Sequence, residues 1–426
     1  MHLSPDEQAI LNGVKGETLA KVMKTLVLYG DAFGADKFID TTAPAHLVTS
    51  FGISVLKPVF SMMDELIDAD LITKEPFTVD PRPIDYENVK CSLPEKIIFS
   101  KIMYGMQAPY EAQLTKLGLK SNKSFTCTCY MDEVGNTPKF GDILSWAESS
   151  AVVYANSVIG ARCNRNSGII ELFGAILGKV PCFDLLTDEG RQSKWIVEIK
   201  TSSLPEAQIL GSAIGKKVME DVPYVKGLDK FLGNDINDNV KSYLKDFGAA
   251  TASNGAVGLY HIEGLTPEAV ASGTDIIRSD AKVYVVDDAE ITRVKDSYPV
   301  MWKNKDAKPE RCFIGCPHLS YNQLGTWVDK FGMELKLQNK KKVVVNTIFT
   351  AAPEVIDRFK AENVKAYNTL LSYGINLSAI CPLMYMNNPL AGKRAVITNS
   401  NKLRTYTAAR YCTDDEIVKV AVQGGF

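Results

Sequence analysis

The sequence lacks long hydrophobic runs and any strong excess of one charge. Its 426 residues include 48 lysines and arginines against 50 aspartates and glutamates, which gives a formal net charge of −2. A chain this close to neutral offers little attraction for nucleic acid or an anionic membrane surface. No apolar run approaches the roughly 18 residues that a membrane-spanning helix needs. We therefore expect neither a nucleic-acid partner nor a membrane.

Several motifs of common enzymes are also missing. The chain has no phosphate-binding G-x-x-x-x-G-K-[ST] loop and no dinucleotide-binding G-x-G-x-x-G. It has no H-E-x-x-H zinc motif, no G-x-S-x-G nucleophile elbow and no C-x-x-C pair. These absences exclude most nucleotide-dependent classes of protein and the commonest hydrolases.

The first residues lack the basic and apolar segments of a secretory signal. They predict a helix instead, because Ser4 suits the N-cap, Pro5 the first helical position and Glu7 the second half of a capping box. We therefore expect a cytoplasmic protein whose nine cysteines are mostly reduced. Buried thiols, a reactive thiol or metal ligands are then the roles open to these cysteines.

Composition and pattern predict an α/β protein. Apolar residues make up 46% of the chain and charged residues 23%, as in ordinary soluble proteins, and the length suffices for two or three domains. The first ~75 residues follow a helical period, and residues 74–88 form a polar, proline-rich stretch that predicts a subdomain boundary. After it, short β-branched runs such as KIIFSKIMYG alternate with helical stretches, which indicates largely buried strands.

Two of the strand-like runs end in the dipeptide Cys-Pro. The stretch RCFIGCPHLS contains Cys316 and Pro317, and SAICPLMYM contains Cys381 and Pro382. Proline has no N–H and a fixed φ, so it is expected to end the strand and hold the cysteine there. Ligands bind at the carboxyl ends of strands in open α/β sheets. The sequence therefore predicts that both cysteines converge on one site.

Three cysteines from separated segments suit an iron–sulfur cluster better than zinc, which usually takes four ligands, often in close pairs. Such a cluster leaves one iron open to act as a Lewis acid on a substrate hydroxyl. Cys127 and Cys129 are candidates for the third ligand, but they alternate along a predicted strand, so only one of them faces the site. The pattern leaves the choice open. A cysteine hydrolase built on Cys316 and His318 is an alternative, and Cys312 is expected to be a buried thiol.

Two basic stretches are candidates for binding an anionic substrate. In ARCNRNSG, Arg162 and Arg165 lie beside the start of a predicted helix, where a carboxylate or phosphate is favoured. A solvated loop with arginines in surface ion pairs is an equally weighted alternative. In TNSNKLRTYTAARY, the hydroxyl of Ser400 and the cation of Lys402 follow a strand-like run. A basic surface loop explains that pattern at least as well.

Taken together, these stretches resemble the aconitase X family, a divergent branch of the aconitase superfamily. The most specific match is AESSAVVYANSVIGARCNR, in which the family usually has threonine at the position of Cys163. FTCTCY is similar to the family's Thr-Cys-Thr-Pro-Tyr, with Cys129 in place of the proline. GCPH, the later Cys-Pro, GADKFIDTTAPAHLVTS, SNGAVGLYHIEGLTPEA and TNSNK match as well, so the resemblance covers essentially the whole chain.

The resemblance implies an α/β fold: an aconitase-like catalytic core of several subdomains that spans residues 1–426 and lacks the swivelling domain. That domain would come from a small partner subunit in a heterodimer, which would also bring a catalytic serine. An iron–sulfur cluster, with [4Fe–4S] among the options, would be held by Cys127, Cys316 and Cys381. The other candidates carried over by position are His46, Ser50, Asn156, Arg162 and Arg165 for substrate binding and His318, Ser400 and Lys402 for catalysis.

The resemblance further implies a hydro-lyase that removes water from a small β-hydroxy acid. The family includes dehydratases of cis-3-hydroxy-L-proline and of mevalonate 5-phosphate. A phosphate demands more cationic contacts than a proline ring. The composition also lacks the enrichment in Glu–Lys ion pairs that is typical of proteins from hyperthermophiles. We therefore predict cis-3-hydroxy-L-proline as the substrate. The alternatives are the large subunit of a mevalonate 5-phosphate dehydratase, and a cluster-binding redox or iron sensor without catalysis.

Overall fold

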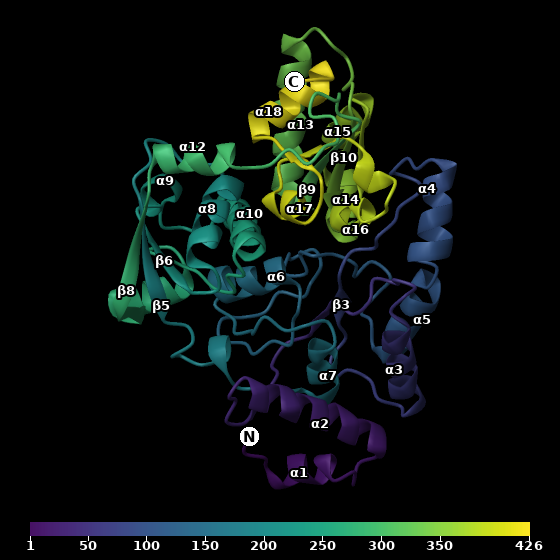
Figure 1. The fold of residues 1–426 in the computed structure, drawn as a ribbon, viewed down its shortest axis with the longest axis vertical. Coiled ribbons are helices and arrows are strands. Elements are labelled where there is room, and N and C mark those ends of the chain that lie inside the picture. Colours follow the sequence, from purple (N-terminus) through teal and green to yellow (C-terminus); the bar gives the residue numbers. More distant parts are fainter.

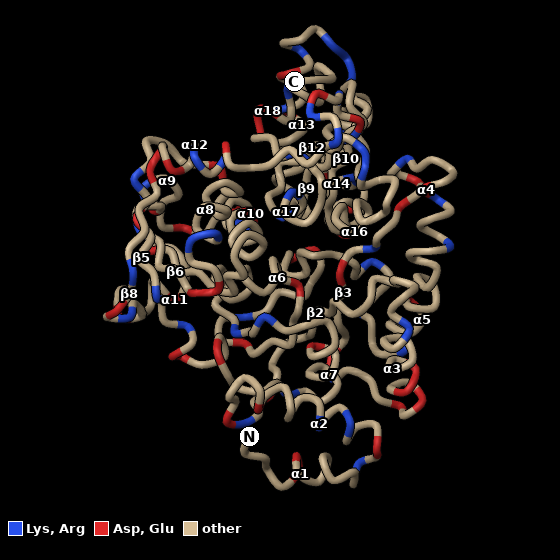
Figure 2. Tube along the Cα trace, in the orientation of Figure 1, with Lys and Arg blue, Asp and Glu red and all other residues tan.

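The computed structural model describes all 426 residues and confirms a mixed α/β fold (Figure 1). An N-terminal region of helices and two-stranded sheets precedes a middle region on a four-stranded sheet and a C-terminal region on a five-stranded sheet. In Figure 1 the N-terminal region lies at the bottom and along the right side, the middle region at the left and the C-terminal region at the top. Acidic and basic residues are interspersed over all three (Figure 2). None of the helices combines the length and apolar character needed to cross a membrane.

The N-terminal region packs its helices around a core of 22 buried apolar residues. The predicted helix start at Ser4 is confirmed, because Ser4 and Glu7 form the expected capping box. Strand β1 pairs with β4 in antiparallel fashion, and β2 pairs with β3 in parallel. The elements are α1 (Pro5–Leu11), α2 (Glu17–Ala32), β1 (Phe38–Asp40), β2 (His46–Leu47), α3 (Lys57–Asp68), β3 (Thr78–Val79), α4 (Leu93–Ile97), η1 (Ile98–Met103), α5 (Gln107–Leu117), α6 (Ser149–Tyr154), η2 (Ala155–Ile159), α7 (Ile170–Leu177), β4 (Lys179–Pro181) and η3 (Asp184–Leu186).

Two stretches of this region differ from the sequence-based expectation. The run KIIFSKIMYG, predicted as a strand, forms the end of α4 and the π-helical η1. Ser92 and Glu95 form a capping box at the start of α4, and this local signal outweighs the β-branched composition. The stretch 74–88 contains β3, whose two residues are buried, while both ends of the stretch are exposed. A subdomain boundary there stays a prediction.

The middle region is built on an all-parallel sheet in the order β7-β6-β5-β8. Helices α8 and α10 pack against each other, and α10 also contacts α6 of the N-terminal region. The elements are β5 (Ser193–Ile199), α8 (Ala207–Val218), β6 (Pro223–Lys226), α9 (Asp229–Leu232), α10 (Asp238–Asn254), β7 (His261–Ile262), α11 (Pro267–Ser272), η4 (Gly273–Ile276), β8 (Ile277–Val286) and α12 (Asp288–Asp296).

The C-terminal region is a second all-parallel sheet, in the order β11-β10-β9-β12-β13. Its central strand β9 is buried along its whole length, as expected for a strand covered on both faces. The elements are β9 (Arg311–Leu319), α13 (Tyr321–Leu337), β10 (Asn346–Ala351), α14 (Pro353–Glu362), α15 (Val364–Ser372), β11 (Ile375–Ser378), α16 (Pro382–Met386), η5 (Ala391–Lys393), β12 (Val396–Thr398), α17 (Asn401–Tyr406), β13 (Arg410–Tyr411) and α18 (Asp414–Gln423).

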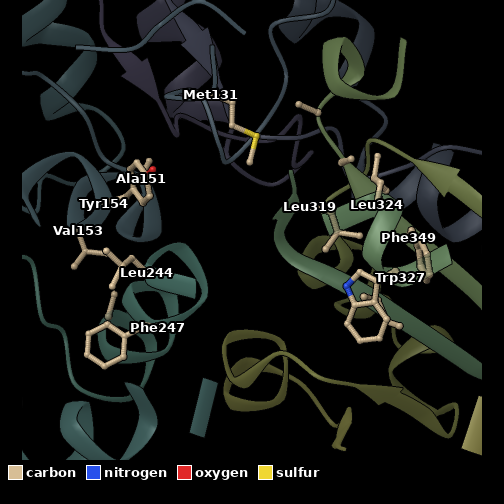
Figure 3. Close-up of a cluster of buried hydrophobic side chains, with 14 of the residues drawn as sticks. Met131, Ala151, Val153, Tyr154, Leu244, Phe247, Leu319, Leu324, Trp327 and Phe349 are labelled. Atoms are coloured by element: carbon tan, nitrogen blue, oxygen red, sulfur yellow. The ribbon is translucent and has the colours of Figure 1, made fainter. Parts of the chain in front are cut away.

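One apolar core of 57 residues joins the middle and C-terminal regions. Figure 3 shows part of it, with Leu244 and Phe247 of α10 on one side and Trp327 and Phe349 of the C-terminal region on the other. Because this core is continuous, the two sheets hold their facing loops in fixed positions. The cysteine-bearing segments lie among those loops.

The pairing of β9 with β10 is interrupted in the second half of β9. Ile314 and Leu319 still pair with β10, but the four residues between them, 315–318, lie opposite Thr350 alone. Gly315 permits this bulge because its φ of +109° is one that residues with a Cβ rarely adopt. The bulge therefore turns the chain out of the sheet at the position of the first Cys-Pro.

The two Cys-Pro dipeptides are positioned differently. The predicted strand end at Pro317 is wrong, since β9 continues to Leu319 and the bulge displaces Cys316. The prediction is confirmed for the second dipeptide: β11 ends at Ser378, Cys381 is the N-cap of α16, and Pro382 opens that helix.

Candidate active site

The structure gathers Cys127, Cys316 and Cys381 from three separate segments. Cys127 lies in an irregular stretch before α6, Cys316 in the bulge of β9 and Cys381 at the start of α16. Burial raises the pKa of all three thiols, and a charge on Cys316 raises the pKa of Cys127 and of Cys381 further. Because such effects fall off with distance, the three thiols share one neighbourhood.

His318 ties the three cysteine segments together. Its backbone N–H lies 3.4 Å from Cys127 Sγ, and its ring Nδ1 lies 2.9 Å from the hydroxyl of Thr126. Its Nε2 lies 3.1 Å from the carbonyl oxygen of Ile380, in the third segment. A carbonyl only accepts, so Nε2 carries the proton and Nδ1 accepts from Thr126. Since Cys316 is two residues away in the chain, one imidazole connects all three segments.

The same bonds leave His318 without a free nitrogen. Burial lowers the pKa of His318 to about 4, so the ring is neutral near pH 7. A base needs an unoccupied nitrogen within reach of the proton that it takes. The geometry therefore supports a positioning role for His318 and not the predicted catalytic one. It also removes the base from the cysteine-hydrolase alternative.

A buried ion pair between Lys402 and Glu148 borders the thiols. Lys402 lies in the first turn of α17 and Glu148 is the N-cap of α6, so the pair bridges the C-terminal and N-terminal regions. Glu148 also accepts hydrogen bonds from the hydroxyl of Ser150 and the N–H of Ala151, each at 2.6 Å. Burial works against its ionisation, but Lys402 and these donors lower the pKa of Glu148 overall.

Lys402 is the cation that stabilises the thiolate forms of the three cysteines. Burial works against its charge, yet Glu148 and the thiolates raise the pKa of Lys402, and Lys402 in turn lowers the pKa of each cysteine. A permanent cation beside three thiols favours their deprotonated, metal-binding form. Of the residues predicted to be catalytic, Lys402 is the one whose charged group faces this site.

His46 and Asp80 form a second buried pair in the site. His46 Nε2 lies 3.4 Å from Asp80 Oδ1, and neither atom has another partner. The other ring nitrogen of His46 lies 2.9 Å from the hydroxyl of Thr78. Burial raises the pKa of Asp80 to about 6, because the charges of His46 and Lys402 offset only part of the cost of desolvation. The two atoms therefore face each other in the protein without a further hydrogen-bond partner.

The two predicted serines are bonded to the backbone around them. Ser400 is the N-cap of α17: its Oγ accepts from the N–H of Leu403 at 3.1 Å and donates to the carbonyl oxygen of Cys316. It thereby holds the first Cys-Pro in place. Ser50 is fully buried, and its Oγ accepts from the N–H of Gly52 at 3.3 Å.

Three predicted substrate-binding residues are engaged elsewhere. Arg162 forms an ion pair with Asp188, and Arg165 donates to the carbonyl oxygen of Ala256. Asn156 makes four hydrogen bonds inside the protein, two donated by its amide nitrogen and two accepted by its oxygen. The amide of Asn156 has no donor or acceptor left for a substrate. The guanidinium groups of Arg162 and Arg165 each have five N–H donors and keep some of them unused, so anion binding by these two residues stays a prediction. Surface ion pairs, the alternative, account for part of their bonding.

The remaining cysteines of the predicted stretches are core residues. The strand expected over SFTCTCY is absent, and Phe125 forms only an isolated bridge. Cys129 and Cys312 are both fully buried in the main apolar core, the latter as predicted. Burial raises the pKa of each thiol well above its usual value, so both behave as small apolar side chains.

The donor set fits an iron–sulfur cluster better than a single ion. No group of three or more His, Cys, Asp or Glu side chains is placed to hold one metal ion. In a cluster each cysteine binds a different iron, so its ligands stand farther apart than those of one ion. Three thiols outside any disulfide, from three rigidly held segments and beside a buried cation, are the ligand chemistry that a cluster needs.

Glu148 and Asp80 were not recognised from the sequence. Glu148 precedes SSA, where an acidic N-cap is a detectable signal. The nearby Ser145 is also of a residue type that caps helices, but it donates to the carbonyl oxygen of Glu171. Asp80 lies in the proline-rich stretch predicted as a boundary, where nothing indicates a buried carboxylate.

Comparison with known proteins places this site in a family. A family model described as "Aconitase X first domain" matches residues 1–189, and one described as "Aconitase X second domain" matches residues 174–296. The crystal structure of Thermococcus kodakaraensis aconitase X in its holo-form superposes with a TM-score of 0.79 and 28% identity, covering 99% of this chain and 100% of that one.

Three named enzymes each match most of the length of this chain. The chain is 30% identical over 414 residues to the phosphomevalonate dehydratase large subunit of Thermococcus kodakarensis, covering 95% of both chains. It is 34% identical over 326 residues to the large subunit of that name from Methanosarcina mazei, covering 76% of this chain and 74% of that one. It is 25% identical to the cis-3-hydroxy-L-proline dehydratase of Pseudomonas aeruginosa, covering 94% of this chain but 65% of that one. The chain thus belongs to the aconitase X family of hydro-lyases.

Proposed function

We propose that this chain is the large, catalytic subunit of a phosphomevalonate dehydratase. The observation that carries the proposal is the match in length: 95% of both chains for the large subunit from Thermococcus kodakarensis, against 65% of the hydroxyproline dehydratase from Pseudomonas aeruginosa. The identities, 30% and 25%, favour the same choice. Mevalonate 5-phosphate is therefore better supported as the substrate than the predicted cis-3-hydroxy-L-proline.

Cys127, Cys316 and Cys381 are the proposed ligands of an iron–sulfur cluster. Their common neighbourhood, their anchoring by His318 and the cation of Lys402 support this assignment. When bound, a cluster with an open iron would supply Lewis acidity for the loss of a hydroxyl group. The chain itself supplies the ligands, the neutral imidazole that fixes them and the charges around them.

Lys402 is the proposed counter-ion of the substrate carboxylate. Its ammonium has three N–H donors, and Glu148 occupies only part of that capacity. A substrate carboxylate bound beside the thiols would therefore pair with a cation that is already held in position. Glu148, fixed by the start of α6, keeps the ammonium from moving away when the site is empty.

His46 and Asp80 are the proposed proton donors. Loss of water from a β-hydroxy acid requires that a base take the proton next to the carboxylate and that an acid give a proton to the departing hydroxyl. His46 Nε2 and Asp80 Oδ1 have no other partner in the protein, so a proton carried by either atom would be free to pass to that hydroxyl. The base belongs to the proposed small swivelling-domain subunit, whose serine would complete the site.

The test is to produce the chain together with a small subunit of this family under anaerobic conditions and assay water loss from both substrates. We expect iron and sulfide in the complex, turnover of mevalonate 5-phosphate and little turnover of cis-3-hydroxy-L-proline. Preferential turnover of hydroxyproline would overturn the substrate assignment. A complex with a full cluster and no turnover of either acid would favour the sensor alternative.

A further inference from the structure

Strands β2 and β3 lie side by side near the centre of the molecule (Figure 2). Their parallel register places His46 directly opposite Thr78. The ladder continues past the end of β3, where the backbone N–H of Asp80 donates to the carbonyl oxygen of Leu47 at 3.0 Å. The ring of His46 accordingly has the hydroxyl of Thr78 at one nitrogen and the carboxylate of Asp80 at the other.

A buried amide is bonded to the hydroxyl of Thr78. Asn136 lies in the irregular stretch before α6 and is 3% exposed. Its Nδ2 donates to the Thr78 hydroxyl at 2.8 Å and to the carbonyl oxygen of Ala45 at 3.1 Å. Because an amide nitrogen only donates, the hydroxyl of Thr78 accepts from Asn136. The single hydrogen of that hydroxyl is then left for another acceptor.

The acceptor within reach of that hydrogen is the ring of His46. Its Nδ1 lies 2.9 Å from Thr78 Oγ1, and the thiol of Cys129 is the other neighbour of the hydroxyl. Sulfur is a weak acceptor, so the hydrogen bond goes to the ring nitrogen. A nitrogen that accepts a hydrogen bond carries no proton. The proton of a neutral His46 imidazole therefore lies on Nε2.

The opposite side of the ring agrees with this assignment. Nε2 faces Asp80 Oδ1 at 3.4 Å, and neither atom has another partner. Burial raises the pKa of Asp80 to about 6, so at pH 8 its carboxylate is ionised and only accepts. A proton on Nε2 gives that carboxylate a donor. Asn136, Thr78 and His46 then each donate toward Asp80 in one continuous direction.

The plane of the His46 ring is fixed by Trp146. The two rings meet edge to face, with centroids 5.9 Å apart and an interplanar angle of 68°. The indole N–H of Trp146 in turn donates to the carbonyl oxygen of Pro44 at 2.9 Å. Because His46, Thr78 and Trp146 are all fully buried, the ring has little room to turn over.

We propose that Asn136 and Thr78 are positioning residues that hold the imidazole of His46 in the tautomer with its proton on Nε2, facing Asp80. Neither residue bonds to the three proposed cluster ligands, so both act through His46. The consequence for the reaction rests on the proposed function, in which His46 and Asp80 supply a proton to the departing hydroxyl. A proton on Nδ1 would point at Thr78 instead, away from Asp80.

Nitrogen NMR of the cluster-free chain with isotope-labelled histidine rings, recorded at pH 8, measures the tautomer directly. The chain has four histidines, and the His46→Gln variant identifies the signals of His46 by their loss. We expect Nε2 of His46 to give the signal of a protonated ring nitrogen and Nδ1 that of an unprotonated one. A protonated Nδ1 in the wild type would overturn the inference.

Asn136→Asp should reverse the direction of the hydrogen bonds, because it replaces the donating amide by an accepting carboxylate of the same shape. The hydroxyl of Thr78 should then donate to that carboxylate and accept from the ring, so we expect Nδ1 of His46 to become protonated. Asn164→Asp is the matched control: Asn164 is also 3% exposed, and its Nδ2 donates to the carbonyl oxygen of Phe183 at 3.0 Å. It should leave Nδ1 unprotonated. The inference is wrong if Asn136→Asp gives the same His46 signals as the wild type.

Thr78→Val gives a second measurement that introduces no buried charge. It keeps the shape of the side chain but leaves Nδ1 of His46 without a hydrogen bond. The Nδ1 signal should therefore move toward that of a free, unprotonated nitrogen, and Thr78→Ser should restore the wild-type position. An unmoved signal in Thr78→Val would contradict a bond from Thr78 to the ring.

Kinetics separate this inference from the proposed function. In the complex with a small subunit, Asn136→Asp should lower kcat for mevalonate 5-phosphate by roughly a hundredfold and change KM less, because a misdirected proton is missing only in the transition state. A changed tautomer with an unchanged kcat would contradict the role of His46 as a proton donor and leave the assigned tautomer standing. A wild-type complex without turnover would contradict the proposed function, whereas the NMR signals would still decide the tautomer.

Discussion

The dipeptide Cys-Pro occurs at Cys316 and at Cys381, and the two copies are held in different ways. Cys316 is 8% exposed, sits in the bulge of a strand buried on both faces and is bonded through its carbonyl oxygen to Ser400. Cys381 is more exposed and is the N-cap of a five-residue helix. Its N–H donates to the carbonyl oxygen of Arg82 at 2.8 Å, and its carbonyl oxygen accepts from the N–H of Tyr385 in that helix at 3.0 Å. The same motif thus marks the position of a ligand, while its neighbours decide how rigidly the ligand is held.

Replacing the cysteines should have the largest effect on the iron and sulfide content, and the two Cys-Pro dipeptides should no longer differ in this respect. Cys316→Ala and Cys381→Ala each remove one of three proposed ligands, so each should reduce iron and sulfide in the anaerobically purified complex to background. Cys312→Ala is the control, because this thiol is buried in the core away from the site and should leave the iron content unchanged. Loss of the cluster on replacing Cys312, with retention on replacing Cys316, would show that the ligand assignment is wrong.

Removing Lys402 should destabilise the fold around both Cys-Pro dipeptides, because the charge of Lys402 acts on all three thiols. Lys402→Met leaves Glu148 as a buried carboxylate without its counter-ion, which typically costs about 3–5 kcal/mol of unfolding free energy. The double variant with Glu148→Met should recover much of that loss. Denaturant unfolding of the cluster-free chain measures both values, and equal losses for the single and double variants would contradict the buried-pair assignment.

Replacing His318 should loosen the connection between the two copies. His318→Phe keeps the shape but leaves the carbonyl oxygen of Ile380 without its partner and removes one of the hydrogen bonds of the Thr126 hydroxyl, which keeps those to Thr128; the cost should be about 2 kcal/mol. The wild type should also lose stability as the pH falls from about 6.5 to about 4. In this range His318 binds a proton in the unfolded chain but not in the folded chain, where it is buried.

The pH dependence separates this role from simple packing. Between these values, the unfolded state holds up to one proton more than the folded state at His318, so the slope is at most about 1.4 kcal/mol per pH unit. The His318→Phe variant lacks the group and should show a shallower decline. Parallel curves for the variant and the wild type, measured by urea unfolding from pH 4 to 7, would argue against a neutral, doubly bonded imidazole.

Much of the architecture could be predicted from local pattern, and the errors have physical causes. Helices with caps and amphipathic faces, such as α1, and the buried strands β9 and β10 follow from period and composition. KIIFSKIMYG was predicted as a strand because its β-branched residues suit one, but the capping box at Ser92 fixes a helix. Ser92, Pro94 and Glu95 carry a capping pattern like that at Ser4, so the sequence does contain the signal that outweighs the β-branched composition.

The candidate site shows a different limit. Each Cys-Pro could be located because proline marks a turn in the chain, and Lys402 because a cation follows a strand. Which groups were already satisfied could not be predicted, since the partner of Arg162 lies 26 positions along the chain and that of Lys402 lies 254 positions away. Tertiary pairing decided that Arg162 binds a surface aspartate and that Asp80, predicted to be in a boundary, is buried beside His46.

The smallest effect should come from Ser400→Ala, which acts on one copy only. Loss of an N-cap costs about 1 kcal/mol, and Ser400 also loses its bond to the carbonyl oxygen of Cys316. In the cluster-free chain, alkylation followed by mass spectrometry should show Cys316 reacting several-fold faster than in the wild type, while Cys381 is unchanged. Ser4→Ala removes a comparable cap at α1, which lies at the opposite end of the molecule from α17 in Figure 1, and should cost similar stability without altering either rate. If Ser400→Ala accelerated both thiols equally, the bulge would not hold Cys316 independently, and the two copies would move as one unit.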